Sequence, residues 1–328
     1  ADNGIAVSAK SADAFPQVTV PITNASTVLR TRGIDADLAH SRVETHTYFI
    51  LQDLNDVSEL GLSKSSVVNH PSVRDRILDE LTAIPSISIS VDAVKLLGTG
   101  GTYYANSRFR GRETELPVSL EIIDPTSGEQ TQVDGGIRVS GGGSRGFSKK
   151  PFRPFLRGAS GDTELKFDLF SQFDDSPVDT FTTLQLKNIG HDSWFGAGGG
   201  GTYISDTFYR HTELAMGNPS PRSAWAHLYL NGEYWGMYMP IERPTPEFAA
   251  GHVGGNPEDW SVMQAAAIVE GSPKEWMEIT ALEETGPIDD AGWERIKQLV
   301  DVDNFIDNLV ADTVTPKSRL EHPNRHGP

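Results

Sequence analysis

A run of glycines next to basic residues is the first feature of this sequence that could do chemistry. Residues 141–146 read Gly-Gly-Gly-Ser-Arg-Gly and match the pattern G-x-G-x-x-G. They follow a strand-like run, and the next stretch, 147–157, carries Lys149, Lys150 and Arg153. Free amides of a glycine turn, together with cations, can hold the phosphates of a polyphosphate ligand. This segment therefore predicts a phosphate-covering hairpin, in which a second strand carries the basic residues.

Two other interpretations of this segment compete with phosphate binding. A dinucleotide-binding turn needs a helix to begin at the glycines, whereas 147–157 contains Pro151 and Pro154 and alternates like a strand. The sequence therefore disfavours a dinucleotide site. Glycine turns between strands are also common where no ligand binds. A flexible hairpin with solvated basic side chains stays open as the alternative.

Three further groups of residues could contribute to a site. The glycine run 198–201 precedes a predicted helix, and it either offers amides to an anion or is a plain loop. On that helix, Arg210 and Glu213 are candidates for an ion pair directed at the basic strand, or for an ordinary surface pair. Residues 242–244, Glu-Arg-Pro, follow a predicted hairpin and form either a hinge beside a cleft or a linker.

The spacing of metal-binding residue types gives no further candidate. The nine histidines contain no H-E-x-x-H pattern. The paired aspartates at 174–175 and 289–290 lack the repeat of a calcium-binding loop. We therefore predict no structural metal site.

The elements that must position these residues follow from hydrophobic periodicity and turn residues. Short alternating runs in the first half predict strands, and helical spacing dominates after residue 244. Between the β-prone runs 226–230 and 233–239, Asn231-Gly232 predicts a type I′ hairpin turn. The other predicted strands are 27–30, 43–49, 86–91, 117–123 and 136–139, and the predicted helices are a connector within 53–83, a helix at 203–216 packed on the sheet, and 273–282, 290–300 and 303–312.

Composition and charge exclude several classes of protein. The 328 residues carry a net charge of −17 and are 37% hydrophobic, which suits a globular protein and disfavours nucleic acid as a partner. The chain has no cysteine, so disulfides and thiolate metal sites are excluded. It has no run of about 18 apolar residues, which predicts no membrane span. Its first ten residues lack the signal-peptide pattern, so we expect any signal peptide to lie outside this chain.

Two motifs, in this order along the chain, resemble the CotH kinase family. Residues 136–153 look like that family's arginine-glycine-serine loop and the lysine strand after it. Residues 228–238, which read LYLNGEYWGMY and lead to Glu242, are similar to the family's hairpin. Residues 210–216 resemble the helix that precedes this hairpin. The resemblance covers residues 117–312.

The resemblance implies a fold class and a division of the chain. The expected fold class is α+β, a reduced protein-kinase-like module with a β-rich lobe and then a helical lobe, preceded by a small β-sandwich fragment. Residues 26–49 look like the end of the chitobiase C-terminal-type sandwich that precedes CotH modules in some large bacterial surface proteins. The expected parts are a sandwich remnant at 1–50, a helical connector at 51–95 and the kinase-related domain at 96–328.

The resemblance also implies an activity. Family members are described as atypical protein kinases that use ATP and a divalent metal to phosphorylate serine on coat or surface proteins. This implies ATP with Mg²⁺ or Mn²⁺ as cofactors, a coat or surface protein as partner, and an extracellular or cell-surface location in a bacterium. The residues that match the nucleotide-binding pattern are Gly141, Gly143, Ser144 and Arg145 in the phosphate loop, Lys149 and Lys150 at the phosphates, and Glu242 at the hinge.

The chain departs from the family pattern after the helix at 303–312. Family members continue into a segment with asparagine and aspartate, and then into a Trp-Asp strand that holds the metal. Neither is recognisable here, since residues 315–328 are polar and contain proline. We therefore expect an incomplete module, assign no catalytic residue or metal ligand, and leave open whether the chain is an enzyme. Two functions remain: ATP-dependent phosphotransfer to serine, active or lost in this chain, and a non-catalytic surface, structural or adhesion protein.

Overall fold

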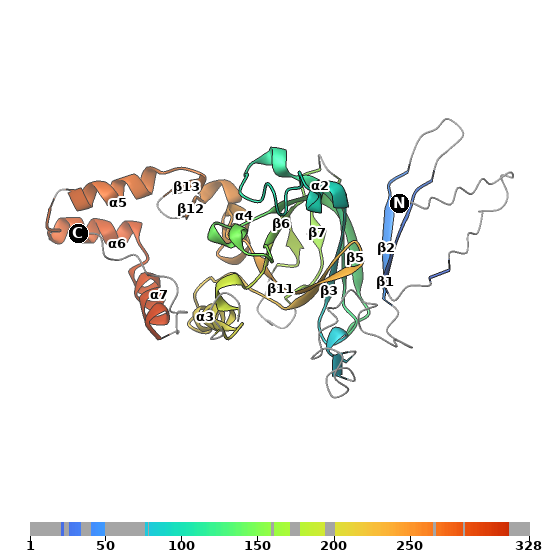
Figure 1. Ribbon diagram of the computed structural model, residues 1–328. Coiled ribbons are helices and arrows are strands. Elements are labelled where there is room, and N and C mark those ends of the chain that lie inside the picture. The colour runs from blue at the N-terminus through green and yellow to red at the C-terminus, as the bar shows by residue number, and fades with distance from the viewer. Residues whose placement is uncertain are drawn as a thin grey trace.

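A closed β-barrel of seven strands forms the centre of the structure, a computed structural model (Figure 1). The strands are joined in the order β10-β11-β9-β6-β5-β4-β3, and a parallel pairing of β3 with β10 closes the ring. Their bounds are β3 (Ser86–Val91), β4 (Leu116–Ile123), β5 (Gln130–Val139), β6 (Phe152–Phe155), β9 (Leu184–Lys187), β10 (Ala226–Leu230) and β11 (Glu233–Glu242). The structure describes residues 21–22, 26–33, 41–49, 76–77, 79–158, 161–170, 178–193, 201–264, 267–284 and 286–314.

The barrel forms because alternate residues of its strands are apolar and point inward. In β5, Ile137 and Val139 are buried in the core, whereas Arg138 between them points to the outer face. In β3, Ile87 and Ile89 are at most 1% exposed. The core is therefore the barrel interior, and the outer faces of β5, β6 and β9 remain available for polar groups.

The β10–β11 hairpin has the predicted turn. Asn231 and Gly232 have φ angles of 52° and 86°, the left-handed pair that a type I′ turn requires. The Asn231 main-chain N donates to the Ile89 carbonyl over 2.9 Å, and its Oδ1 accepts from the Val91 N over 2.8 Å. The prediction for residues 226–239 is confirmed, and the turn also fastens the hairpin to β3.

The helices follow most of the strands, and the fold class is α+β (Figure 1). The four helices predicted after residue 200 are confirmed as α3 (Ser205–Ala215), α5 (Lys274–Glu284), α6 (Asp290–Leu299) and α7 (Val302–Val314). The shorter elements are α2 (Ala93–Leu97), β7 (Leu165–Lys166), β8 (Thr180–Phe181), α4 (Pro246–His252), β12 (Val262–Gln264) and β13 (Ala267–Glu270). Within the described part of the chain, no helix is both long and apolar enough to cross a membrane.

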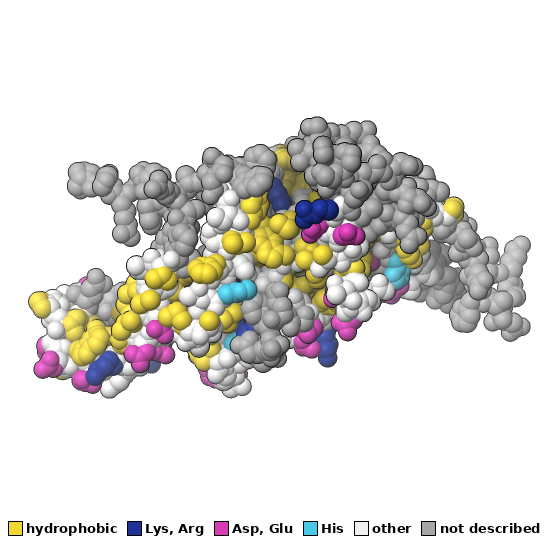
Figure 2. All heavy atoms as spheres, turned by 90° about the horizontal axis from the view of Figure 1, so that it is seen from below, with side chains coloured by type: hydrophobic (Ala, Val, Ile, Leu, Met, Phe, Trp, Pro, Cys, Tyr) yellow, Lys and Arg dark blue, Asp and Glu magenta, His cyan; other side chains and the backbone are white. Residues whose placement is uncertain are grey.

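The helices α5 and α6 extend away from the barrel, α7 lies beside α3, and all three carry exposed apolar side chains (Figure 1). Hydrophobic atoms gather over this part of the molecule when it is seen from below (Figure 2). The larger of these exposed side chains are Trp276, Met277, Trp293, Phe305, Ile306 and Leu309. The helical segment therefore buries less apolar surface than the barrel does.

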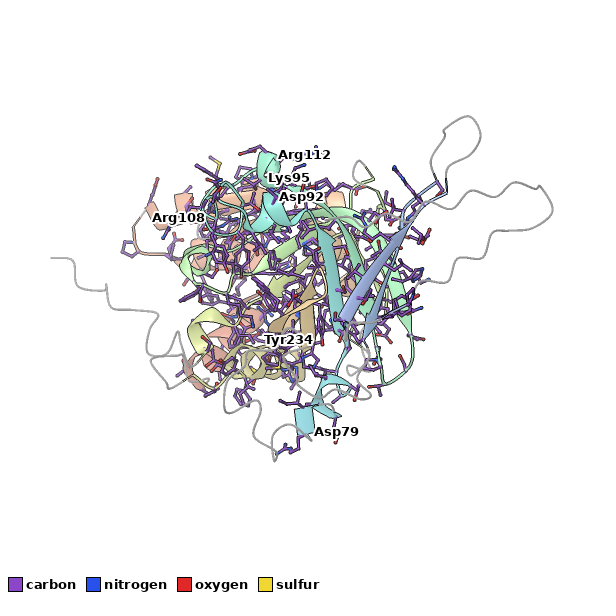
Figure 3. The ribbon with its side chains drawn as sticks, turned by 45° about the vertical axis from the view of Figure 1, so that its right-hand side comes forward. Asp79, Asp92, Lys95, Arg108, Arg112 and Tyr234 are labelled. Carbon is purple, nitrogen blue, oxygen red and sulfur yellow. The ribbon has the colours of Figure 1, made fainter. Side chains whose placement is uncertain are left out.

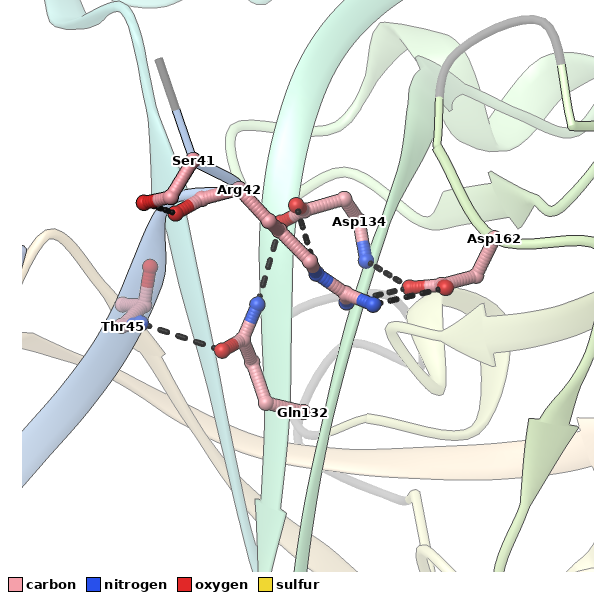
Figure 4. A network of polar contacts seen from close by, with 6 residues as sticks. All are labelled: Ser41, Arg42, Thr45, Gln132, Asp134 and Asp162. Atoms are coloured by element: carbon pink, nitrogen blue, oxygen red, sulfur yellow. Dashed lines mark hydrogen bonds and ion pairs between the residues drawn. The ribbon is translucent and has the colours of Figure 1, made fainter. Parts of the chain in front are cut away.

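A separate two-stranded sheet, β1 (Ser26–Thr31) and β2 (Glu44–Phe49), is held to the barrel by side chains (Figure 4). The Thr45 main-chain N donates to Gln132 Oε1 over 3.0 Å, and Arg42 contacts Asp162 at 2.9 Å and Asp134 at 3.4 Å. This sheet is the described part of the predicted sandwich remnant. Most of the predicted connector at 51–95 lies outside the described residues, but β3, which that range includes, is a barrel strand.

The Glu121 carboxylate makes the docking of β2 sensitive to pH. It is 6% exposed, and its two oxygens accept hydrogen bonds from the N–H and the hydroxyl of Thr47. Burial raises the pKa of Glu121 above its ordinary value of 4.5, although the bonds from Thr47 oppose the shift. Folding therefore favours the protonated form. This stabilising contribution is complete below pH 4.5 and is lost as the pH rises through the raised pKa.

We expect the Glu121→Gln variant to unfold at a higher temperature than the wild type at pH 7, because the amide keeps an acceptor without a buried charge. The difference should shrink toward zero as the pH falls to about 4, where the wild-type carboxyl is protonated. Thermal melts between pH 4 and 8 measure it, with Glu129→Gln at an exposed position as the control. A difference that grows toward acid pH would contradict this prediction.

Candidate functional site

A cavity of about 470 Å³ lies on the outer face of the barrel, over β5, β6 and β9 and beside the glycine loop. None of its described lining residues carries a carboxylate. In a protein with a net charge of −17, such a concentration of positive charge marks a site for an anion. The five arginines that line it are Arg110, Arg138, Arg145, Arg153 and Arg243.

Arg110 reaches the cavity from a loop that carries two more exposed arginines, Arg108 and Arg112. Both lie at the end of the barrel where α2 lies, while Tyr234 lies toward the opposite end (Figure 3). The basic residues of this loop therefore add to the positive charge at one end of the barrel.

Two of the lining arginines face each other across a strand pair. Arg138 of β5 is the register partner of Arg153 of β6, and like charges placed directly opposite destabilise a sheet. The Arg153 Nε donates to the Thr183 hydroxyl over 3.0 Å, which fixes its direction. Burial, followed by the charges of Arg243 and Arg138, lowers the pKa of Arg153 to about 9. An anion placed between these groups would relieve the repulsion.

The Phe155 ring holds three guanidinium groups beside the cavity. The Cζ atoms of Arg138, Arg157 and Arg153 lie 3.8, 4.1 and 4.4 Å from the ring centroid, within the range of cation–π attraction. Glu115 Oε2 lies 3.2 Å from Arg138 Nε and 3.4 Å from an Arg157 terminal nitrogen. Neither of these ion pairs involves Arg153. The charge of Arg153 faces the cavity.

The glycine loop is held in place by a buried arginine. Arg145 is 9% exposed, and its Nε donates to the Gly141 carbonyl over 2.7 Å. Its Nη1 donates to the carbonyls of Ser107 and Phe109 over 2.8 and 3.0 Å. Gly141 has a φ of 89°, and a Cβ there would lie 2.1 Å from Ser144 Oγ, so this position requires glycine. Both Gly141 and Arg145, which the sequence placed in a phosphate loop, lie on the cavity wall.

Neutral donors complete the wall. Ser140 lines the cavity, and its buried Oγ has no hydrogen-bond partner among the described residues. Gly142 and Gln185 lie beside it. Guanidinium groups combined with a hydroxyl and glycine main chain are a donor set that suits phosphate oxygens. The predicted loop residues Gly143 and Ser144 belong to a 3-10 turn at 143–146 and are not among the lining residues described.

Lys150 supports the glycine loop from behind instead of entering the cavity. It is 5% exposed, and its Nζ donates to the carbonyls of Arg145 and Phe147 over 3.0 and 2.6 Å. Its main-chain N donates to the Tyr103 hydroxyl over 2.9 Å. The predicted strand that carries this lysine is also corrected, because β6 begins only at Phe152, after both lysines.

Lys149 is directed away from the cavity as well. Its ammonium donates to the Met237 carbonyl of β11 and lies 4.4 Å from the centroid of the Tyr238 ring. Burial lowers the pKa of Lys149 to about 8. The interpretation of this residue as an exposed phosphate contact is therefore corrected: the side chain is half-buried and joins the glycine loop to β11.

We expect Lys149→Ala to change the affinity for ATP by less than about twofold, because its ammonium binds a main-chain carbonyl outside the cavity. Isothermal titration of ATP into the variant and the wild type measures the effect. Lys149→Met, which keeps most of the aliphatic stem, controls for lost packing. A tenfold loss in both variants would show that the ammonium turns toward the ligand.

Glu242 ends β11 within a buried polar cluster. It is 3% exposed, its Oε2 accepts from the Arg222 N over 2.7 Å, and its Oε1 lies 2.7 Å from His252 Nε2. An Arg222 Nη1 lies 2.9 Å from His252 Nδ1. Since a guanidinium only donates, Nδ1 accepts, and the hydrogen on Nε2 is donated to Glu242. The cluster joins the end of the barrel to α4, and the role of Glu242 as a hinge stays a prediction.

The ion pair predicted between Arg210 and Glu213 is wrong. Arg210 Nε lies 2.9 Å from Asp206 Oδ2, one helical turn earlier, and Asp206 also contacts Lys187 of β9 at 2.8 Å. The i,i+4 spacing puts Arg210 beside Asp206, whereas Glu213 is buried elsewhere on α3. Asp206 therefore fastens α3 to the barrel. Residues 198–200 of the second glycine run lie outside the described residues.

The donor set of the cavity does not fit a divalent metal. Mg²⁺ and Mn²⁺ prefer carboxylate oxygens, whereas the described lining is rich in arginine, which repels a cation. Across the described part of the chain, no group of three or more His, Cys, Asp or Glu side chains is placed to hold a metal ion. The described lining residues therefore suit phosphate oxygens, and the described part of the chain supplies no site for the metal.

Of the lining arginines, the sequence interpretation missed Arg110 and Arg138, considered Arg243 only within the possible hinge at 242–244, and treated Arg153 only as part of a basic segment. A signal for two of them was present. Arg138 and Arg153 each stand between apolar residues in a strand-like run, which sends both side chains to the face opposite the core. Their pairing in register, and the approach of Arg243 from the end of β11, could not be read from the sequence.

One family model matches this chain. It is described as CotH kinase protein and matches residues 137–318, more than half of the 328 residues. The match begins within β5 and includes the glycine loop, β6, β9 and the β10–β11 hairpin. No curated protein matches the chain.

Proposed function

Because the chain belongs to the CotH kinase family, we propose that it is a kinase-like module that transfers phosphate from ATP to serine of a bacterial coat or surface protein. The cavity with five arginines is the observation that carries this proposal. Arginine binds phosphate oxygens through paired, charge-assisted hydrogen bonds, and its charge is retained at every physiological pH.

Each wall of the cavity has a separate part in holding the phosphates. Arg138 and Arg153 approach from the facing strands β5 and β6, and Arg243 approaches from the end of β11. Arg145 keeps the main chain of Gly141 in place at the loop. ATP supplies the phosphoryl group when bound, and these residues bind, orient and neutralise it, which is most of what phosphoryl transfer asks of a protein. No general base is assigned, since no carboxylate is among the described lining residues.

The wider architecture is proposed by the same reasoning from family membership. The barrel corresponds to the β-rich lobe of a two-lobed kinase-like arrangement, and α5, α6 and α7 correspond to the helical lobe. Glu242, buried where β11 ends, lies at the junction of the two. We place the protein outside the cell or at its surface, where coat and surface proteins are the available serine substrates.

The test is transfer of radiolabelled γ-phosphate from ATP to serine-rich peptides and to the chain itself, with Mg²⁺ or Mn²⁺ present. Phosphoserine after acid hydrolysis, lost in Arg153→Met and kept in Arg157→Met, is the expected result. Arg157 contacts the same Phe155 ring but does not line the cavity, so it is a matched control. ATP binding without transfer to any serine would favour the non-catalytic alternative, and no ATP binding would overturn the proposal.

A further inference from the structure

The cavity carries more positive charge than the carboxylates around it can balance. Five arginines line it, and among the described residues three carboxylates act on them from outside the lining, namely Glu113, Glu115 and Glu270. Glu115 is shared with Arg157, which does not line the cavity. An excess of positive charge therefore remains even when all three carboxylates are counted.

Burial increases the effect of this excess. Burial is the first cause of a lowered pKa in four of the five arginines, because a charged guanidinium loses hydration there. For Arg153, the next causes are the neighbouring arginines themselves. A cavity of this kind stabilises an anion, and it repels any cation that arrives with that anion.

The usual arrangement in kinases differs from this one. There, carboxylates hold divalent cations that bridge the phosphates and neutralise their charge. In the described part of this chain, no cluster of acidic or histidine side chains is placed for that purpose, whereas guanidinium groups approach from two strands, from the residue after β11 and from two loops. The positive charge that phosphates need is therefore already present in the protein.

We propose that this cavity binds the triphosphate group of its ligand as a metal-free anion, with the arginines supplying the charge neutralisation that a divalent cation supplies in other kinases. The inference rests on the proposed function for its choice of ligand, and it adds a separate claim about the metal. Arg138, Arg153 and Arg243 are the groups that contact the phosphoryl oxygens, and the unpartnered Ser140 hydroxyl donates a further bond.

The residues that line the cavity suit the phosphate groups of a nucleotide better than its nucleoside. Phe155 is the aromatic side chain of the described lining, and three guanidinium groups already cover its ring. A nucleobase therefore finds no uncovered ring on which to stack in this cavity. We expect inorganic tripolyphosphate to bind within about tenfold of ATP, because both present the same chain of charged oxygens.

The experiment is isothermal titration of the chain with ATP and with tripolyphosphate, each in EDTA and in excess Mg²⁺. Both ligands should bind about tenfold or more tightly in EDTA, since magnesium cancels part of the charge that the arginines bind. Binding that requires Mg²⁺ would overturn the inference and leave the proposed function standing. No binding of ATP under either condition would overturn both.

A pair of variants tests whether the preference for metal-free ATP depends on the cavity. Arg243→Gln removes one lining charge and should reduce the preference for metal-free ATP, measured as the ratio of the two Kd values. Arg157→Gln removes a charge next to the cavity and should keep the wild-type ratio. A general loss of structure would weaken both conditions together and leave the ratio unchanged. An unchanged ratio in folded Arg243→Gln, shown by its thermal melt, would contradict the inference.

Discussion

Replacing Arg153 by methionine is expected to weaken ATP binding about 10- to 100-fold, the loss that follows from removing one or two charge-assisted hydrogen bonds. Arg153 faces Arg138 on the cavity wall, and the Thr183 hydroxyl and the Phe155 ring hold its guanidinium in position. The unfolding temperature should be unchanged or higher, because the substitution removes a like-charge pair and keeps the apolar stem. Isothermal titration and thermal melts measure the two effects.

The control for this prediction is Arg157→Met. Arg157 belongs to the same charge cluster, 4.1 Å from the Phe155 centroid and 3.4 Å from Glu115. Because it does not line the cavity, we expect its replacement to change ATP affinity by less than about twofold. An Arg153→Met protein that binds ATP as tightly as the wild type would falsify the assignment of this cavity to phosphates.

Unlike the replacement of Arg153, replacing Arg145 by alanine should cause a large loss of stability. Its guanidinium makes three hydrogen bonds to main-chain carbonyls, those of Gly141, Ser107 and Phe109. Without it these buried and partly buried acceptors lose their donor, and we expect the free energy of unfolding to fall by about 3 to 5 kcal/mol. ATP binding should weaken at least about tenfold in the protein that remains folded, since the glycine loop loses its support and the cavity loses a charge.

Chemical unfolding in urea measures the loss of stability, and titration at low temperature measures binding by the folded fraction. Arg108→Ala is the matched control, since Arg108 is an exposed arginine of the same loop as Ser107 and Phe109. We expect that control to change stability by less than about 0.5 kcal/mol. A stable Arg145→Ala protein would show that the carbonyls find other donors, which would remove Arg145 from its supporting role.

Local predictions from the sequence were confirmed where neighbouring residues decide the structure. The Asn231-Gly232 turn follows from the left-handed angles that these two residues tolerate and most others do not. Helix α6 begins at residue 290, as the spacing predicted, because the Asp289 side chain accepts from the Gly292 N over 2.8 Å and caps it. These features depend on residues that are close together in the sequence, so they can be predicted without the tertiary structure.

The directions of the Lys149 and Lys150 side chains could not be predicted from the sequence alone. A run of basic residues after a glycine loop predicts cations at a phosphate, and the sequence cannot tell which of them turns toward it. In the structure, the Lys149 and Lys150 ammonium groups bind main-chain carbonyls, while Arg153, three residues later, faces the cavity. The difference arises because β6 begins only at Phe152, and the strand's alternation sets directions from that residue onward.

By itself, the sequence determined the family, the α+β class, the glycine loop and the hairpin, because each depends on residue types at short spacing. Only the tertiary structure decided which charged side chains lie close together. The antiparallel register puts Arg138 opposite Arg153, the pairing of β11 with β9 and of β9 with β6 brings the end of β11 with Arg243 beside them, and Arg145 reaches back to the loop at Ser107. These contacts join segments far apart in the chain, and they form because burying the apolar face of each strand leaves the arginines together on the outside.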